Sequence, residues 1–149
     1  MAEPSIAIDS VKVLVVEDNA DDRELLMRQL RKSGLGEHVK FISDGKEAHD
    51  FLTGPDAPRP DELIIILLDL RLPSLSGLEL LRRLRALPRF HSLPVTVMTS
   101  SNDPHDLEEC RRLNVVNYLN KPVTFDSFSK AVADIFHPPK AAGESAASA

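Results

Sequence analysis

The hydrophobic positions of this chain fall into five short apolar runs, each followed by an amphipathic segment. A short apolar or β-branched run predicts a strand, whereas apolar residues that recur every three or four positions predict a helix with one buried face. The predicted strands occupy residues 12–18, 39–43, 63–69, 94–101 and 116–123. The predicted helices occupy residues 20–33, 44–52, 74–87, 103–114 and 124–136.

The regular alternation of strands and helices predicts the fold class. The run Leu63–Asp69 is the most apolar of the five, which is typical of a strand that is covered on both faces at the centre of a parallel sheet. Parallel neighbours need helical crossovers, so five strands and five helices indicate a doubly wound, open α/β domain with a five-stranded parallel sheet. In such sheets functional residues gather at the carboxyl ends of the strands.

Several residues mark where the helices begin, end and turn inward. Gly34 and Pro88 are expected to end the first and third helices, and Thr124 is expected to cap the last one. The third helix carries leucines at a spacing of three residues, which predicts a buried face of Leu75, Leu78, Leu81 and Leu84. Cys110 lies among apolar residues of the fourth helix and is interpreted as core packing.

Composition narrows the class of protein. The chain has 149 residues, of which 42% are hydrophobic and 28% are charged, a composition typical of one globular domain. We place this domain at residues 11–137. An N-terminal extension, 1–10, is expected before it and a disordered Ala/Ser-rich tail, 138–149, after it. The single cysteine excludes an intramolecular disulfide. A net charge of −5 argues against nucleic acid as the main partner. Neither a secretion signal nor a membrane span is evident, and the expected location is the cytoplasm.

Polar side chains stand where the predicted strands end. Glu17 and Asp18 follow the first strand, Asp69 ends the third, Thr99 lies at the end of the fourth and Lys121 at the end of the fifth. Two carboxylates about 4 Å apart repel by roughly 4 kcal/mol at an effective dielectric constant near 20, so such a cluster calls for a cation. Carboxylate oxygens are the ligands that Mg²⁺ prefers. An acidic Mg²⁺ site beside a lysine suits phosphoryl transfer, and Asp69 is the natural nucleophile.

With these motifs in this order, the chain resembles the receiver domain of two-component response regulators from about residue 11 to residue 136. The motifs are VVED, LLDLRLP, GLELL, VMTSS and YLNKPV. The resemblance implies a flavodoxin-like fold of the receiver type and a phosphoprotein that accepts a phosphoryl group on Asp69 from a histidine kinase or a small phosphodonor. The opening EDNADD, the long loop before the third strand, TSSND and NKPVTF are most similar to the small receivers that partner bacterial phytochromes, which makes a bacteriophytochrome the implied kinase.

The resemblance also implies roles for individual residues. Asp18, Asp69 and the backbone carbonyl of Arg71 would bind Mg²⁺, and Glu17 would do so through water, since the family often has Asp at that position. Thr99 and Lys121 would contact the phosphoryl oxygens. Thr99 and Tyr118 would move inward together on phosphorylation, although an aromatic residue near a sheet edge equally often serves packing. Arg71 and Ser101 flank the site in this family and influence how fast phosphate is lost.

The expected output is a change of protein partner rather than enzymatic turnover. Phosphorylation would reshape the surface formed by residues 103–114, 116–123 and 124–136, where a homodimer could form. The chain is expected to be a stand-alone receiver, without an output domain after residue 136. Two other classes stay open. A scaffold that works without phosphorylation is one, and a phosphatase of the haloacid dehalogenase type is the other, although that type needs a second acid where Arg71 stands.

Overall fold

The described part of the computed structural model, residues 11–55, 57–59, 62–63, 65–100, 103–115 and 117–136, forms one parallel five-stranded sheet in the order β2-β1-β3-β4-β5. The predicted extension 1–10, the tail 138–149 and Ser101 lie outside the described residues. The strands are β1 Val13–Val16, β2 Val39–Ile42, β3 Ile65–Asp69, β4 Val95–Thr99 and β5 Asn117–Asn120. All four strand pairings are parallel, so every strand ends at the same edge of the sheet.

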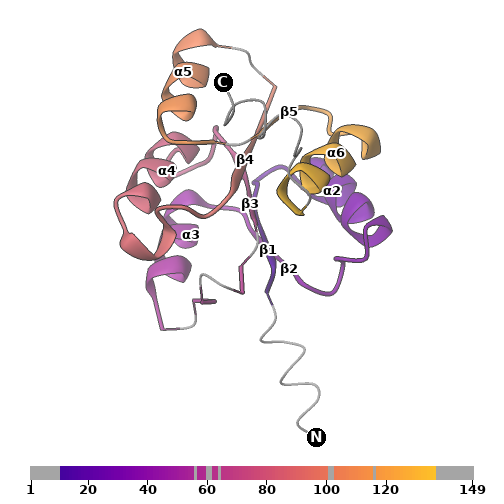
Figure 1. The fold of residues 1–149 in the computed structure, drawn as a ribbon, viewed down its shortest axis with the longest axis horizontal. Coiled ribbons are helices and arrows are strands. Elements are labelled where there is room, and N and C mark those ends of the chain that lie inside the picture. The colour runs from indigo at the N-terminus through magenta and orange to yellow at the C-terminus, as the bar shows by residue number, and fades with distance from the viewer. Residues whose placement is uncertain are drawn as a thin grey trace, which may run out of the picture.

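Helices cover both faces of this sheet. They are α2 Ala20–Lys32, α3 Gly45–Thr53, α4 Gly77–Arg85, α5 Pro104–Arg112 and α6 Phe125–Phe136, with a short 3₁₀ helix, η1, at Pro88–Phe90. Figure 1 shows α3, α4 and α5 on one side of the sheet and α2 and α6 on the other. The fold class is therefore the predicted one, a doubly wound α/β domain of the flavodoxin-like receiver type.

Alternation along the strands divides the core into two layers. Leu14 and Val16 of β1 face the layer under α3, α4 and α5, whereas Val13 and Val15 face the layer under α2 and α6. Both faces of β1 and β3 are buried, which explains why their sequences are continuously apolar. Cys110 is fully buried in the first layer, as predicted.

The third predicted helix differs from its expected face. The helix α4 begins at Gly77, so Leu75 precedes it, and the fully buried leucines are Leu80, Leu81 and Leu84. Leu78 is only partly buried, because residues three and four apart share a face of 3.6 residues per turn and a strict three-residue spacing drifts away from it. The strands are also shorter than predicted, and Lys12, Ser43 and Lys121 are among the predicted strand residues that lie outside the observed strands.

The predicted helix boundaries are largely confirmed. Asn19, Asp44 and Ser76 cap α2, α3 and α4 by accepting a hydrogen bond from a backbone N–H three residues later. Thr124 Oγ1 accepts from Ser127 N at 3.1 Å at the start of α6, as expected for a cap. Gly34 follows the end of α2 with φ +79°, a left-handed conformation that suits glycine.

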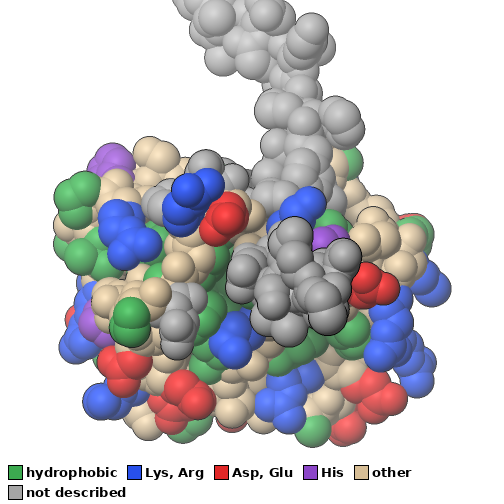
Figure 2. Space-filling model, turned by 90° about the horizontal axis from the view of Figure 1, so that it is seen from below, with side chains coloured by type: hydrophobic (Ala, Val, Ile, Leu, Met, Phe, Trp, Pro, Cys, Tyr) green, Lys and Arg blue, Asp and Glu red, His purple; other side chains and the backbone are tan. Residues whose placement is uncertain are grey.

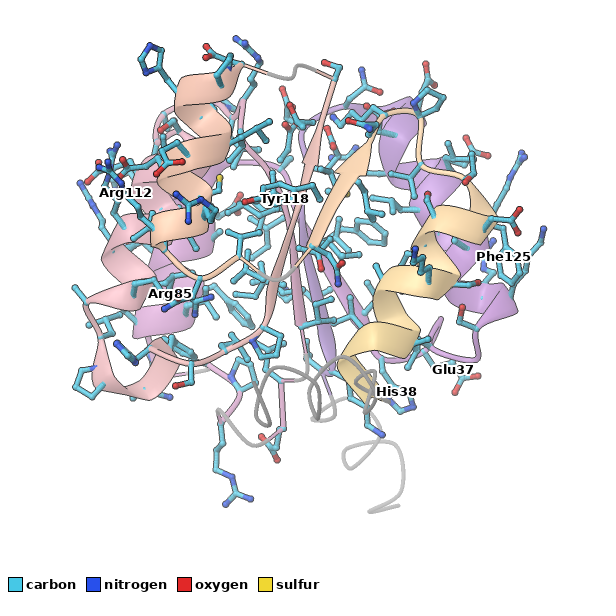
Figure 3. The ribbon with its side chains drawn as sticks, turned by 45° about the horizontal axis from the view of Figure 1, so that its top comes forward. Glu37, His38, Arg85, Arg112, Tyr118 and Phe125 are labelled. Carbon is cyan, nitrogen blue, oxygen red and sulfur yellow. The ribbon has the colours of Figure 1, made fainter. Side chains whose placement is uncertain are left out.

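Arg85, at the end of α4, joins two loops at the pole opposite to the strand ends: the connection between α4 and β4, and the connection after α5. Its guanidinium donates hydrogen bonds to the carbonyl oxygens of Phe90, His91 and Leu93, and to those of Leu113 and Asn114 after α5. Figure 3 shows Arg85 where α4 meets these loops. Arginine offers five N–H donors in a rigid fork, and this pole of the molecule uses them on backbone groups.

Charged side chains of both signs lie on the face of the molecule near the start of β1 (Figure 2). Seen from the end of the sheet where β1 begins, basic and acidic side chains are intermixed over the described part of the face (Figure 2). Among the described residues, the helices are too short or too polar for any of them to cross a bilayer.

Candidate functional site

The ends of β1, β3 and β5 bring together most of the side chains that the sequence singled out. Glu17 and Asp18 follow β1, Asp69 is the last residue of β3, and Lys121 directly follows β5. β3 is the neighbour of β1 and is separated from β5 on its other side by β4, and all the strands are parallel, so their ends lie at the same edge of the sheet. The result is a pocket of about 480 Å³ that is lined by Glu17, Asp18, Asn19, Asp22, Asp69, Arg71, Ser100, Lys121 and Pro122.

Lys121 forms ion pairs with three carboxylates of the site. Its ammonium nitrogen lies 2.7 Å from Glu17 Oε1, 2.9 Å from Asp69 Oδ2 and 3.1 Å from Asp22 Oδ2. Burial by itself would lower the pKa of Lys121, but its hydrogen bonds to these carboxylates hold that pKa above its ordinary value. Lys121 is therefore a permanent cation at the carboxyl end of the sheet.

Three acids form a cluster with the donor set of a divalent-cation site. One carboxylate oxygen from each of Glu17, Asp18 and Asp69 lies within 4.8 Å of the other two. Glu17 and Asp69 are buried and Asp18 is exposed, so the cluster opens to solvent on one side. Hard oxygen ligands at an open position, where water can complete the shell, fit Mg²⁺ or Mn²⁺.

The electrostatics of Glu17 support the need for a cation. The pKa of Glu17 is raised to about 7, chiefly by burial and to a lesser degree by the charge of Asp69, although hydrogen bonds from Lys121 and the backbone N–H of Asn19 act in the opposite direction. Both carboxylate oxygens of Glu17 have neighbours inside the protein, because Oε2 accepts from Asn19 N at 3.0 Å while Oε1 faces Lys121. Both oxygens of Glu17 would therefore already contact protein groups when a metal ion binds.

Asp69 is held in a fixed orientation. Its Oδ1 accepts a hydrogen bond from Arg71 N at 3.0 Å, and its Oδ2 accepts one from Lys121 Nζ at 2.9 Å. The side chain of Asp69 is 8% exposed, so it is shielded but reachable from the pocket. The side chain of Arg71 is exposed at the rim of the pocket.

Thr99 and Tyr118 lie on adjacent strands and differ in exposure. Thr99 is buried at the end of β4, and its carbonyl oxygen accepts a hydrogen bond from Lys121 N at 2.9 Å. Tyr118 on β5 is 38% exposed, and its hydroxyl donates to the carbonyl oxygen of Leu107 at 3.4 Å. Figure 3 shows Tyr118 between β5 and α5, so its hydroxyl bonds to α5.

Sequence reasoning missed Asp22 as a member of the site. Asp22 lies in the first turn of α2, one helical turn beyond Asp18, and its carboxylate contacts Lys121. The available signal was the second pair of acids in EDNADD, which the helix geometry brings back to the pocket that Asp18 enters.

Comparison with known proteins identifies the family. The family model described as the response regulator receiver domain matches residues 13–133, which is most of the chain. The match spans all five strands and begins at the first residue of β1.

Three relatives illustrate the similarity. The probable methanogenesis regulatory protein FilR2 of Methanothrix harundinacea (strain 6Ac) is 34% identical over 87% of this chain and 83% of its own length. A solved bacteriophytochrome response regulator, RtBRR, is 38% identical with a TM-score of 0.73, over 83% of this chain and 76% of that one. The response regulator Rcp1 of a Synechocystis species is 32% identical over 83% of this chain and 84% of its length. Rcp1 has also been solved in a Mn²⁺-bound form, which matches with a TM-score of 0.70 and 30% identity, over 83% of this chain and 92% of that one.

Proposed function

The chain belongs to the response regulator receiver family, and on this premise we propose that it is a phosphorylation-dependent signalling protein whose phosphoryl acceptor is Asp69. The observation that carries the proposal is the contact of Asp69 Oδ2 with Lys121 Nζ beside an acidic cluster at the carboxyl end of β3. In the transfer, a carboxylate oxygen of Asp69 forms a bond to phosphorus while the bond between phosphorus and the donor breaks.

The chain's own residues would each supply part of the catalysis. Lys121 places a positive charge where the oxygens of the incoming phosphoryl group would lie, and Arg71 N orients the acceptor carboxylate by a hydrogen bond. Thr99 would donate its hydroxyl to the same phosphoryl oxygens. After transfer, a water molecule would attack phosphorus and release inorganic phosphate, which restores the carboxylate of Asp69.

We propose Mg²⁺ as the cofactor, held by Asp18, Asp69 and the backbone carbonyl of Arg71, with Glu17 acting through a water molecule. The spacing of the acidic oxygens fits this role, and the engagement of both Glu17 oxygens favours the indirect contact. When bound, Mg²⁺ would neutralise negative charge on the transferring phosphoryl group. The Mn²⁺-bound form of Rcp1 supports the choice of a divalent metal.

The output would be a change of protein partner. Phosphorylation adds charge at Asp69, and a movement of Thr99 and Tyr118 would carry this change to the surface of α5, β5 and α6. We propose that a histidine kinase donates the phosphoryl group, and the similarity to RtBRR favours a bacteriophytochrome as that kinase. We also propose that the protein forms a homodimer through the surface of α5, β5 and α6, and that it is located in the cytoplasm. Phe125 on α6 is 39% exposed and suits such an interface, whereas Phe128 is buried against the sheet.

Intact mass spectrometry tests the proposal. The protein is incubated with acetyl phosphate and Mg²⁺, and a gain of about 80 Da, one phosphoryl group, is expected. EDTA should prevent the gain, and Asp69→Asn should abolish it. The matched control is Asp126→Asn, which changes an exposed acid in the first turn of α6 and should leave the adduct intact.

Two results would overturn the proposal. An adduct that persists in Asp69→Asn would place the acceptor elsewhere. No adduct in wild-type protein, with either acetyl phosphate or an added histidine kinase, would favour the scaffold that works without phosphorylation. Continuous release of phosphate from phosphate esters would favour the phosphatase, the class that the position of Arg71 opposes.

A further inference from the structure

The three N–H donors of the Lys121 ammonium group are matched by three carboxylates from three different elements. Glu17 comes from the loop after β1, Asp69 from the end of β3 and Asp22 from the first turn of α2. All three oxygens lie within 3.1 Å of the nitrogen. An ammonium group has three donors, so the carboxylates already present are enough to occupy all of them.

Asp22 differs from the other two carboxylates. It is not part of the cluster whose oxygens converge within 4.8 Å, which consists of Glu17, Asp18 and Asp69. It is also more exposed, at 27% for the side chain against 0% for Glu17 and 8% for Asp69. Asp22 therefore contacts the cation from the rim of the pocket, outside the candidate metal site.

The start of α2 fixes where Asp22 stands. The backbone N–H of Asp22 donates to Asn19 Oδ1 at 2.9 Å, and Asn19 N in turn donates to Glu17 Oε2 at 3.0 Å. This chain of hydrogen bonds ties the helix cap to the buried acid. The carboxylate of Asp22 is thus presented to Lys121 by a rigid helix start rather than by a free loop.

We propose that Asp22 is a positioning residue that holds the ammonium group of Lys121 at the rim of the pocket and restrains phosphoryl transfer to Asp69. This inference rests on the proposed function. A phosphoryl group arriving at Asp69 needs an N–H of Lys121, and Asp22 competes for it. Asp22 also adds negative charge at the mouth through which an anionic phosphodonor enters.

The direct test is the rate at which acetyl phosphate and Mg²⁺ phosphorylate three variants, followed by intact mass. Asp22→Asn keeps the shape and removes the charge, and its phosphorylation should be faster than that of wild type by roughly 3- to 10-fold. Asp22→Glu should return the rate towards the wild-type value. Asp21→Asn is the matched control, because Asp21 is an exposed acid of the same helical turn, and it should change the rate by less than about 1.5-fold.

A second measurement needs no phosphorylation. In protein labelled with ¹⁵N-lysine, the ammonium protons of Lys121 should exchange slowly with water in wild type, because three carboxylates hold them. Their exchange should be faster in Asp22→Asn and unchanged in Asp21→Asn. A purely structural role of Asp22 would not single out these protons.

The outcomes separate this inference from the proposed function. An equal acceleration in Asp21→Asn and Asp22→Asn would mean that the loss of any nearby negative charge speeds the reaction, and it would overturn the positioning role. An unchanged or slower rate in Asp22→Asn would also overturn it. If wild type takes up no phosphoryl group, the proposed function fails. The proton-exchange measurement then tests the contact of Asp22 with Lys121 independently, and an exchange rate of the Lys121 protons that Asp22→Asn leaves unchanged would overturn the role of Asp22.

Discussion

Gly77, the first residue of α4, packs directly against the backbone of Asp69, the last residue of β3. Gly77 N donates a hydrogen bond to the carbonyl oxygen of Leu70 at 3.0 Å. A Cβ on Gly77 would overlap the carbonyl oxygen of Asp69 and crowd Leu70 Cα. The GLELL motif thus begins with glycine because the helix start lies against the strand end that carries the proposed acceptor carboxylate.

Gly77→Ala should therefore destabilise the protein by about 3 kcal/mol, since backbone atoms cannot move aside as a flexible side chain would. Urea unfolding measures the change. Gly36→Ala is the matched control: its added Cβ would come closest to Cγ in the flexible side chain of Arg31 and would meet the backbone Cα of Arg31 only at about 3.4 Å, so its effect should stay within about 1 kcal/mol. Equal losses in the two variants would contradict the packing argument.

Arg85 should be sensitive to a change that keeps its charge. Arg85→Lys offers three donors without the fork and leaves backbone carbonyls in the two loops without their partner, so we expect a loss of at least about 2 kcal/mol in the free energy of unfolding. Arg83→Lys is the control, because Arg83 is exposed and pairs only with Glu79 among the described residues, and its effect should be within about 0.5 kcal/mol. A small effect of both changes would show that the loops do not depend on Arg85.

Stability should depend on the titration of Glu17. Its folded-state pKa of about 7 exceeds the ordinary value of 4.5, so between these values the folded protein binds more protons than the unfolded chain. The free energy of unfolding should therefore fall as pH rises through this window, on the order of 2 kcal/mol. Urea unfolding in EDTA at several pH values measures the slope.

Two variants check that assignment. Glu17→Gln should be less sensitive to pH over the same range, whereas Glu24→Gln, a change in an exposed acid of α2, should keep the wild-type slope. Added Mg²⁺ should restore stability mainly at the higher pH, where Glu17 is ionised. Parallel slopes for wild type and Glu17→Gln would assign the pH dependence to another group.

The acidic cluster predicts metal affinity that depends on Asp18. Asp18→Asn removes a charged ligand of the proposed site and should weaken Mn²⁺ binding by about tenfold or more, as followed by electron paramagnetic resonance. Asp21→Asn changes the net charge equally but lies outside the cluster, and it should bind Mn²⁺ nearly as wild type does. Equal weakening in both variants would indicate a nonspecific effect of net charge.

Tyr118 is the only tyrosine in a chain without tryptophan, so intrinsic fluorescence observes this residue alone. Phosphorylation with acetyl phosphate and Mg²⁺ should change its emission as the ring leaves α5. Thr99→Ala should take up phosphate but lose this change. An unchanged emission despite a full adduct in wild type would contradict coupling between the two residues. Tyr118→Phe should alter stability by less than about 0.5 kcal/mol, because the ring is exposed and its hydrogen bond is long at 3.4 Å.

The fold class and most of the candidate site could be predicted from the amino-acid sequence. The continuous apolar run before Asp69 is typical of a strand covered on both faces, and β3 is the central strand of the sheet. Parallel strands end at one edge, so the residues after β1, β3 and β5 had to lie close together. That rule alone placed Glu17, Asp18, Asp69 and Lys121 in one pocket.

Tertiary structure decided which atoms meet. Helical spacing could not tell that α4 begins at Gly77 and buries Leu80 in place of Leu75, because the start depends on how the helix packs against Asp69. The contact of Asp22 with Lys121 depends on the angle between β1 and α2. The outward position of Tyr118 depends on the side-chain rotamer that lets its hydroxyl reach α5. Local sequence determines which elements form, whereas distances between side chains of different elements follow only once the whole core has packed.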